Sequence, residues 1–133
     1  MRGTEMEKFL NAHFCSKDET VFAGTHLIID IWDGQHLGNI AVIEQAFSNA
    51  ITDVGATLLH MHFHHFGPEQ GVSGVAVLQE SHISIHSWPE VGYAAIDIFL
   101  CGNLDPLKAV AAFKAAFETD NVGLSEFRRG IIG

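Results

Sequence analysis

Residues 72–101, VSGVAVLQESHISIHSWPEVGYAAIDIFLC, contain three segments with the composition of β-strands. Segment 72–80 is short and apolar with Gly74 inside it, Ser81–Trp88 alternates polar and apolar residues, and Tyr93–Cys101 is again mostly apolar. Proline and glycine within 89–92 favour a turn between the second and third segments. We therefore predict three strands here, two of which meet at Glu80 and Ser81.

The segments before residue 72 add two further strands. Residues 25–32, THLIIDIW, are rich in β-branched and aromatic side chains and end at Asp33 and Gly34, which favour a turn. Residues 56–66 have strand composition as well, and 67–71 contain the glycine and proline typical of a loop.

Two helices are predicted from capping residues and apolar spacing. Asn39 is a favourable N-cap and Gly55 a favourable left-handed stop for a helix between them, and Asp105 and Pro106 are typical of the start of a second helix over 107–117. In the first helix the apolar residues recur every three or four positions, which predicts one buried face. These residues are Ile40, Ile43, Phe47, Ile51 and Val54.

The order of elements predicts an α+β fold. Residues 121–132 add a last strand, and the connections are too short for repeated parallel crossovers. We expect a two-layer sandwich: a mainly antiparallel sheet with both helices on one face, formed by residues 25–133. The uncovered apolar face predicts a homodimer that forms through the sheet. Residues 1–24 are predicted to be an N-terminal extension with at most one short helix.

Composition excludes several classes of protein. A chain of 133 residues that is 47% hydrophobic can fill one core and is unlike disordered chains. Seven Lys and Arg against 16 Asp and Glu give 7 − 16 = −9, which argues against nucleic acid or an anionic membrane as partner. Neither a signal-type apolar segment nor a long apolar run occurs, so we predict a cytoplasmic protein whose Cys15 and Cys101 are thiols.

Two stretches of the chain resemble the short prokaryotic S-adenosylmethionine decarboxylases: residues 71–90, GVSGVAVLQESHISIHSWPE, and residues 92–102, GYAAIDIFLCG. The similarity extends, with gaps, from about residue 25 to residue 130, and its core is Glu-Ser-His…His…Trp-Pro-Glu with a Cys 20 residues after the Ser. The resemblance implies self-cleavage between Glu80 and Ser81, which leaves a pyruvoyl group generated from Ser81 as the cofactor. It also implies decarboxylation of S-adenosylmethionine to CO2 and the aminopropyl donor for spermidine.

The resemblance assigns processing and catalysis to four side chains. Ser81 attacks the preceding carbonyl in an N-to-O acyl shift that gives an ester, β-elimination of this ester leaves dehydroalanine at position 81, and hydrolysis of the dehydroalanine gives the pyruvoyl group. Ser73 and His86 match processing residues, His86 being the base that removes the α-proton. Cys101 matches the thiol that returns a proton to the substrate carbon, a task that needs a pKa near the working pH.

Three more positions match substrate-binding residues of the family. Phe66 and Trp88 stand where aromatic side chains lie near the adenine, and Glu90 stands where a carboxylate accepts the ribose hydroxyls. Five residues separate Phe66 from Val72, one more than in typical members. Taken singly, such residues are ordinary core, turn or strand residues, and only their joint spacing indicates a site.

Two alternative functions remain open at the level of sequence. Some relatives decarboxylate L-ornithine or L-arginine with the same pyruvoyl chemistry, although Trp88, Glu90 and Phe66 favour a nucleoside substrate. The chain could also be a non-processing homologue with a binding or regulatory role, against which the presence of Ser73, Ser81, His86 and Cys101 argues.

Strand geometry constrains how this site is assembled. Residues five apart in a regular strand point to opposite faces and lie about 16 Å apart, at roughly 3.3 Å per residue. His86 should therefore not reach Ser81 of its own strand. Either a sharp bend occurs at Ser81, or His86 and Ser73 meet Ser81 and Cys101 of a second chain across a dimer interface.

A second group of candidate residues is the histidine tract His60, His62, His64 and His65. The first, second and third of these share a face by the period of two, and imidazoles at such spacing can bind zinc or nickel. The tract contains no Asp, Glu or Cys, and the resemblance implies no metal. We predict that these histidines line the sheet face near the site and that no metal is bound.

Overall fold

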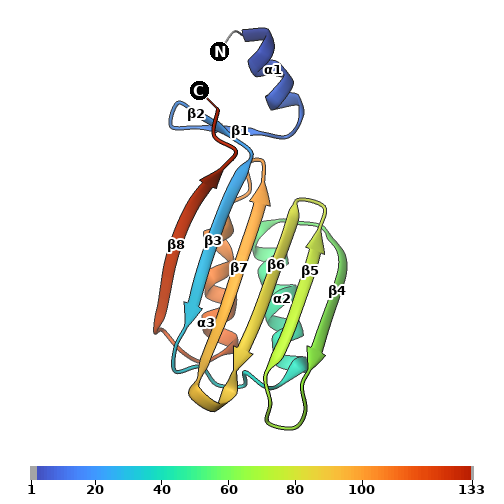
Figure 1. Cartoon of the computed structure of the whole chain (residues 1–133), viewed down its shortest axis with the longest axis vertical. Coiled ribbons are helices and arrows are strands. Elements are labelled where there is room, and N and C mark those ends of the chain that lie inside the picture. The colour runs from blue at the N-terminus through green and yellow to red at the C-terminus, as the bar shows by residue number, and fades with distance from the viewer. Residues whose placement is uncertain (1–2, 133) are drawn as a thin grey trace.

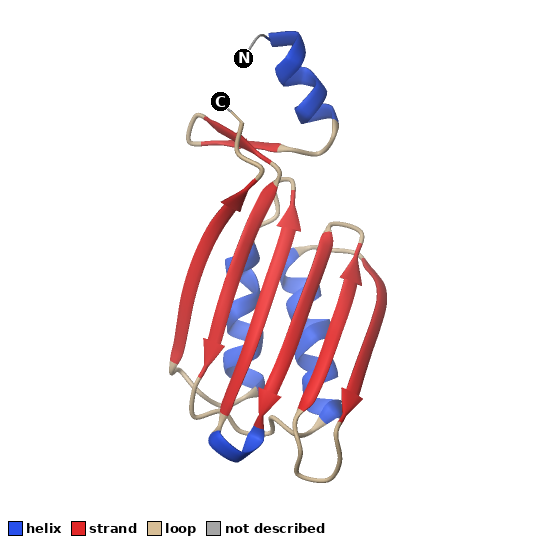
Figure 2. Cartoon of the chain, viewed as in Figure 1, coloured by secondary structure: helices blue, strands red, loops and turns tan. Residues whose placement is uncertain are grey.

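The computed structural model describes residues 3–132, which form one six-stranded sheet with helices on one face (Figures 1 and 2). The sheet order is β4-β5-β6-β7-β3-β8, and all neighbours are antiparallel. This confirms the predicted α+β fold. The strands are β1 (Cys15–Lys17), β2 (Thr20–Phe22), β3 (Gly24–Ile31), β4 (Leu58–His65), β5 (Val72–Leu78), β6 (Ser81–Trp88), β7 (Tyr93–Cys101) and β8 (Val122–Arg129).

The helices begin and end near their predicted capping residues. They are α1 (Gly3–Asn11), α2 (Ile40–Val54) and α3 (Val110–Ala116), with short 3₁₀ turns η1 (Pro89–Val91) and η2 (Pro106–Ala109). The Asn39 side chain accepts a hydrogen bond from the Val42 N–H at 3.3 Å, and Gly55 has a φ of +77°. The second predicted helix starts as η2 and continues as α3. None of the helices in residues 3–132 is long and apolar enough to span a membrane.

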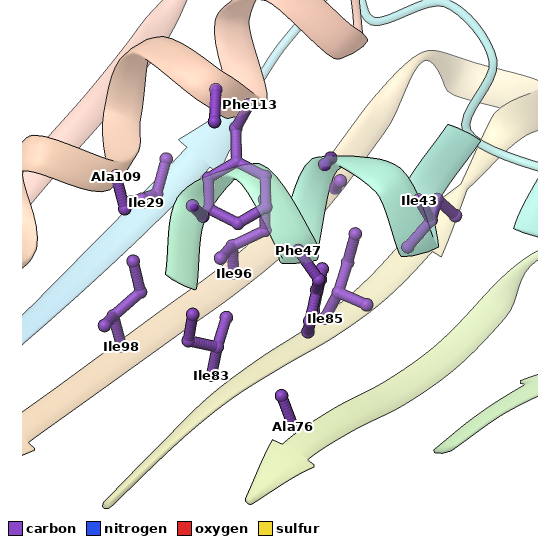
Figure 3. Close-up of a cluster of buried hydrophobic side chains, with 14 of the residues drawn as sticks. Ile29, Ile43, Phe47, Ala76, Ile83, Ile85, Ile96, Ile98, Ala109 and Phe113 are labelled. Atoms are coloured by element: carbon purple, nitrogen blue, oxygen red, sulfur yellow. The ribbon is translucent and has the colours of Figure 1, made fainter. Parts of the chain in front are cut away.

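The core lies between the sheet and helices α2 and α3 (Figure 3). In strands β3, β5, β6 and β7, the apolar residues that point to the helices alternate with the other residues and are buried, as the period of two requires. The Phe47 ring of α2 packs edge-on against Phe63 of β4 at 4.9 Å and Phe113 of α3 at 5.8 Å. Each such buried ring stabilises the fold by roughly 1.5–3 kcal/mol. These contacts fix the sheet against one layer of helices only.

The other face of the sheet carries no helix (Figure 2). Its side chains alternate with the buried set and include four large exposed apolar residues, Ile28, Val75, Val77 and Phe127. Near the centre, Asp97 accepts a hydrogen bond from Ser84 Oγ at 2.9 Å and lies 3.1 Å from His82 Nε2. We call this surface the open face. It mixes apolar and polar side chains along its length.

The N-terminal segment contains more structure than the short helix expected there. After α1, strands β1 and β2 form a hairpin whose turn residues, Asp18 and Glu19, have φ of +54° and +63°. Phe22 is buried, and the Val21 carbonyl accepts a hydrogen bond from the Ile132 N–H at 2.8 Å. The hairpin therefore packs against the end of the sheet. The sequence prediction missed it.

Candidate active site

The bond between Glu80 and Ser81 lies in the two-residue turn that joins β5 to β6. The predicted strand over 72–80 ends at Leu78, which pairs with Ser81. Ser81 has a φ of +140°, a conformation that L residues rarely adopt and that costs of order 1–3 kcal/mol. The residue implied to be cleaved is therefore held in a strained backbone.

Backbone N–H groups hold both polar ends of Glu80. The Cys101 N–H donates to the Glu80 carbonyl at 2.9 Å, and the Thr57 N–H donates to Glu80 Oε1 at 2.9 Å. The Gln79 N–H donates to the Thr57 carbonyl at 2.9 Å. The turn is thus anchored on one side to the start of β4 and on the other to the end of β7. Its carbonyl oxygen faces a fixed donor.

Cys101 lines a cavity of about 410 Å³ beside this turn. Cys101 itself is half-buried, and both cysteines are free. Burial raises the pKa of the Cys15 thiol in β1. The residues that line the cavity are His13, Gln79, Glu80, Cys101, Gly102, Asn103 and Leu104.

Ser73 and His86 meet on the open face at the other end of the sheet. They are cross-strand partners of β5 and β6, and Ser73 Oγ lies 2.9 Å from His86 Nδ1. This contact orients the imidazole. It places the two processing residues in hydrogen-bond contact, as their implied shared role requires.

A second cavity, of about 240 Å³, contains the implied substrate-binding residues. Phe66 belongs to it despite the extra residue in the loop that follows. The Trp88 ring packs against Tyr93 with the ring centroids 5.3 Å apart and the ring planes tilted by 32°, and the Tyr93 hydroxyl donates to Asp30 Oδ1 at 2.6 Å. This hydrogen bond, together with burial, raises the pKa of Tyr93 to about 12. The cavity is lined by Phe66, Gln70, Gly71, Ser73, His86, Ser87, Trp88 and Glu90.

The two cavities share no lining residue. The β5–β6 turn and the end of β7, which line one cavity, lie at one end of the sheet, and the β4–β5 loop and the end of β6, which line the other, lie at the opposite end (Figure 1). Strand β6 pairs with β7 over its whole length, from Ser81 opposite Leu100 to Trp88 opposite Tyr93. No sharp bend in β6 therefore brings His86 to Ser81 within this chain. The turn with Cys101 and the pair formed by Ser73 and His86 are two halves of the predicted site, held apart.

The histidine tract lies on the edge strand β4. His60, His62 and His64 are exposed on the open face, and His64 is the cross-strand partner of Ser73. The His64 ring also contacts Phe66, with centroids 4.6 Å apart. Within residues 3–132, no group of three or more His, Cys, Asp or Glu side chains is arranged to hold a metal ion.

Sequence reasoning did not identify Ser87, which positions the Ser73–His86 end. Its hydroxyl is buried, donates to the Leu37 carbonyl at 2.6 Å and accepts from the Val72 N–H at 2.9 Å. The sequence did contain a signal for Ser87. The alternation set by Ile83 and Ile85 predicts a buried apolar residue at position 87, and a serine stands there. His13 gave no comparable signal, because only the fold brings this residue, distant in sequence, to Cys101.

Comparisons with known proteins identify the family of the chain. A family model described as S-adenosylmethionine decarboxylase matches residues 25–130. The S-adenosylmethionine decarboxylase proenzyme of Methanococcus aeolicus is 46% identical over 110 residues, which cover 80% of this chain and 93% of that protein. The corresponding proenzyme of Thermomicrobium roseum is 37% identical over 110 residues, covering 82% and 95%.

A solved structure is similar as well. The crystal structure of the adenosylmethionine decarboxylase from Aquifex aeolicus matches with a TM-score of 0.75 and 27% identity, over 84% of this chain and 94% of that chain. Together, the matched residues 25–130, the relatives of nearly equal length and the common fold confirm the resemblance inferred from the motif. This chain belongs to the S-adenosylmethionine decarboxylase family.

Proposed function

We propose that the chain cuts itself between Glu80 and Ser81 and then decarboxylates S-adenosylmethionine, giving CO2 and the aminopropyl donor for spermidine. The observation that carries the proposal is the geometry of the β5–β6 turn: a strained Ser81 follows a carbonyl that accepts the Cys101 N–H at 2.9 Å. That the relatives are named proenzymes supports processing of the chain.

The turn is suited to attack on its own peptide bond. When Ser81 Oγ adds to the Glu80 carbonyl carbon, negative charge develops on the carbonyl oxygen. A fixed N–H donor at that oxygen, here from Cys101, stabilises the charge. Breaking the C–N bond to Ser81 also releases the backbone from its φ of +140°. The product of this step is an ester between Glu80 and the Ser81 side chain.

His86 removes the α-proton of residue 81 so that the ester is eliminated. The contact with Ser73 Oγ leaves Nε2 of the imidazole as the nitrogen available for the proton. Because the two halves of the site lie at opposite ends of one sheet, the proton must move between two chains. A two-fold axis between stacked open faces, running across the strands, places each Ser73–His86 pair over the β5–β6 turn of the partner subunit.

The processed homodimer then holds its substrate between the same two halves. A pyruvoyl group at residue 81 fits the strained turn beside the 410 Å³ cavity and supplies an electron sink for the decarboxylation. Phe66 and Trp88 stack on the adenine and Glu90 accepts the ribose hydroxyls, and this set favours S-adenosylmethionine over a small amino acid. Cys101 returns a proton to the substrate carbon. The requirement for this free thiol supports a reducing compartment such as the cytoplasm.

Mass spectrometry and a substrate panel test the proposal. A denaturing intact-mass spectrum should show fragments 1–80 and 81–133, the second without a free amino group. The cleaved protein should release CO2 from S-adenosylmethionine and not from L-ornithine or L-arginine. A chain that stays whole on long incubation would mean a non-processing homologue, and release from an amino acid alone would reassign the substrate.

Co-expression tests the shared site. A Ser81→Ala chain keeps its Ser73–His86 pair, and a His86→Ala chain keeps its scissile turn, so one composite site in each mixed dimer is complete. We expect the His86→Ala chain to be cleaved in the mixture although neither variant is cleaved alone. The absence of cleavage in a purified mixed dimer would show that the site is not shared.

A further inference from the structure

The N-terminal segment brings one titratable side chain to the scissile turn. His13 follows α1, its N–H donates to the Leu10 carbonyl at 3.2 Å, and its φ is +66°. Its carbonyl oxygen packs so close to Gly102 that a Cβ on Gly102 would lie 3.4 Å from it. The segment lies beyond the same end of the sheet as the end of β7 and the β5–β6 turn (Figure 1).

The hairpin that follows His13 is docked against the six-stranded sheet. Arg128 of β8 donates to the Lys17 carbonyl at 3.2 Å and to Asp18 Oδ2 at 2.6 Å, and its guanidinium lies 4.7 Å from the Phe22 ring centre. The Gly102 N–H donates to the Ala23 carbonyl at 3.1 Å. The hairpin that follows His13 is thus anchored to both β7 and β8.

His13 lines the 410 Å³ cavity together with Glu80 and Cys101. Among the described residues that line this cavity, it alone carries an imidazole, which donates hydrogen bonds to anions. It also lies outside residues 25–130, the part of the chain that matches the family model. Any role of His13 at this cavity therefore comes from a part of the chain that the family model does not match.

Self-cleavage creates an anion at this place. When the ester is eliminated, the bond between Ser81 Oγ and Cβ breaks, and Oγ leaves with Glu80. It becomes the second oxygen of a new α-carboxylate at the end of fragment 1–80. The Cys101 N–H already donates a hydrogen bond to the original Glu80 carbonyl oxygen. The second oxygen needs a donor of its own, because an unpaired charged group inside a cavity is costly.

We propose that the His13 imidazole binds the α-carboxylate that cleavage frees at Glu80, so that the new chain end stays docked against the wall of the cavity and leaves its interior open to substrate. The inference rests on the proposed self-cleavage. The Glu80 side chain does not compete for His13, since its Oε1 is already held by the Thr57 N–H.

Trimming of the cleaved protein by carboxypeptidase Y tests this. The protease removes Glu80 only when the chain end leaves the cavity, so the trimming rate measures how often that occurs. We expect His13→Ala to raise the rate of Glu80 removal by about tenfold, as the loss of a hydrogen bond to a charged group implies. Intact mass of fragment 1–80 over time provides the readout.

Two matched variants separate binding from structure. His13→Gln and His13→Ala carry the same backbone strain at φ +66°, but glutamine keeps a side-chain N–H donor, so its rate should return toward the wild-type value. Asn11→Ala, an exposed change in the same segment, should trim like the wild type. Equal rates for wild type and His13→Ala, or for His13→Ala and His13→Gln, would overturn the inference. A wild-type chain that never cleaves would overturn the proposed function with it.

Discussion

His86 and Ser81 act at successive steps on one bond, so the removal of each should leave a different species. Without the imidazole that takes the α-proton, a His86→Ala chain should stop at the ester between Glu80 and Ser81. We expect neutral hydroxylamine to split this variant into two fragments, because it cleaves esters and leaves peptide bonds intact. Ser81→Ala should stay whole under the same treatment, and denaturing mass spectra measure both.

The Ser73→Ala variant is the comparison for the His86→Ala variant in this prediction. The Ser73 hydroxyl lies 2.9 Å from Nδ1 of the imidazole and orients it, so the loss of this hydroxyl should slow elimination without abolishing it. If His86→Ala resists hydroxylamine as fully as Ser81→Ala does, His86 acts before the ester forms and the assigned order of steps is wrong.

At the scale of the elements, strand β5 contains a glycine, Gly74, that leaves room for a side chain of the neighbouring strand β4. The Phe63 ring of β4 lies over Gly74, and a Cβ at Gly74 would overlap the ring. Phe63 also packs on Phe47 in the core, so it has little room to move. We expect Gly74→Ala to lower the free energy of unfolding by about 1–3 kcal/mol, as overpacking does, in urea denaturation.

Gly123 of β8 provides the control for this change. A Cβ there would meet only Asp30 Cβ at 3.8 Å, an ordinary contact. Gly123→Ala should therefore leave stability unchanged or raise it by up to about 1 kcal/mol through the loss of unfolded-state entropy. Equal losses for the two glycines would show that Phe63 does not set the cost at Gly74.

The elements also differ in how far the sequence predicts them. The cap at Asn39, the stop at Gly55 and the bounds of β6 and β7 follow from local side-chain chemistry, and the structure has them. The N-terminal hairpin could not be predicted in this way. Its turn places Asp18 and Glu19 at positive φ, where the usual signal is Asn-Gly or Asp-Gly, and its stability comes from contacts with the distant Arg128.

For the whole molecule, the period of two already predicts that Ser81 and His86 lie apart, and the pairing of β6 over its full length agrees. Which side chains gather at each end is a different matter. The cavity beside Cys101 is lined in part by His13, and the cavity beside His86 in part by Phe66, and only the fold brings these distant parts of the sequence together. Local patterns do not contain such contacts, so only motif resemblance could indicate part of them.

The stacking of two open faces in a dimer can be tested by placing a charge on this surface. If two open faces stack to complete the site, a charge placed among their exposed apolar residues must be desolvated in the dimer, at a cost of several kcal/mol. Val77 on the open face and Leu107 in the helix layer are each 42% exposed, so lysine at either position is equally tolerated by an isolated chain. We expect Val77→Lys to sediment as a monomer and to remain uncleaved, whereas Leu107→Lys should dimerise and cleave normally. A folded Val77→Lys monomer that still cuts itself would place the complete processing site within one chain, and a Leu107→Lys monomer would move the interface to the helices.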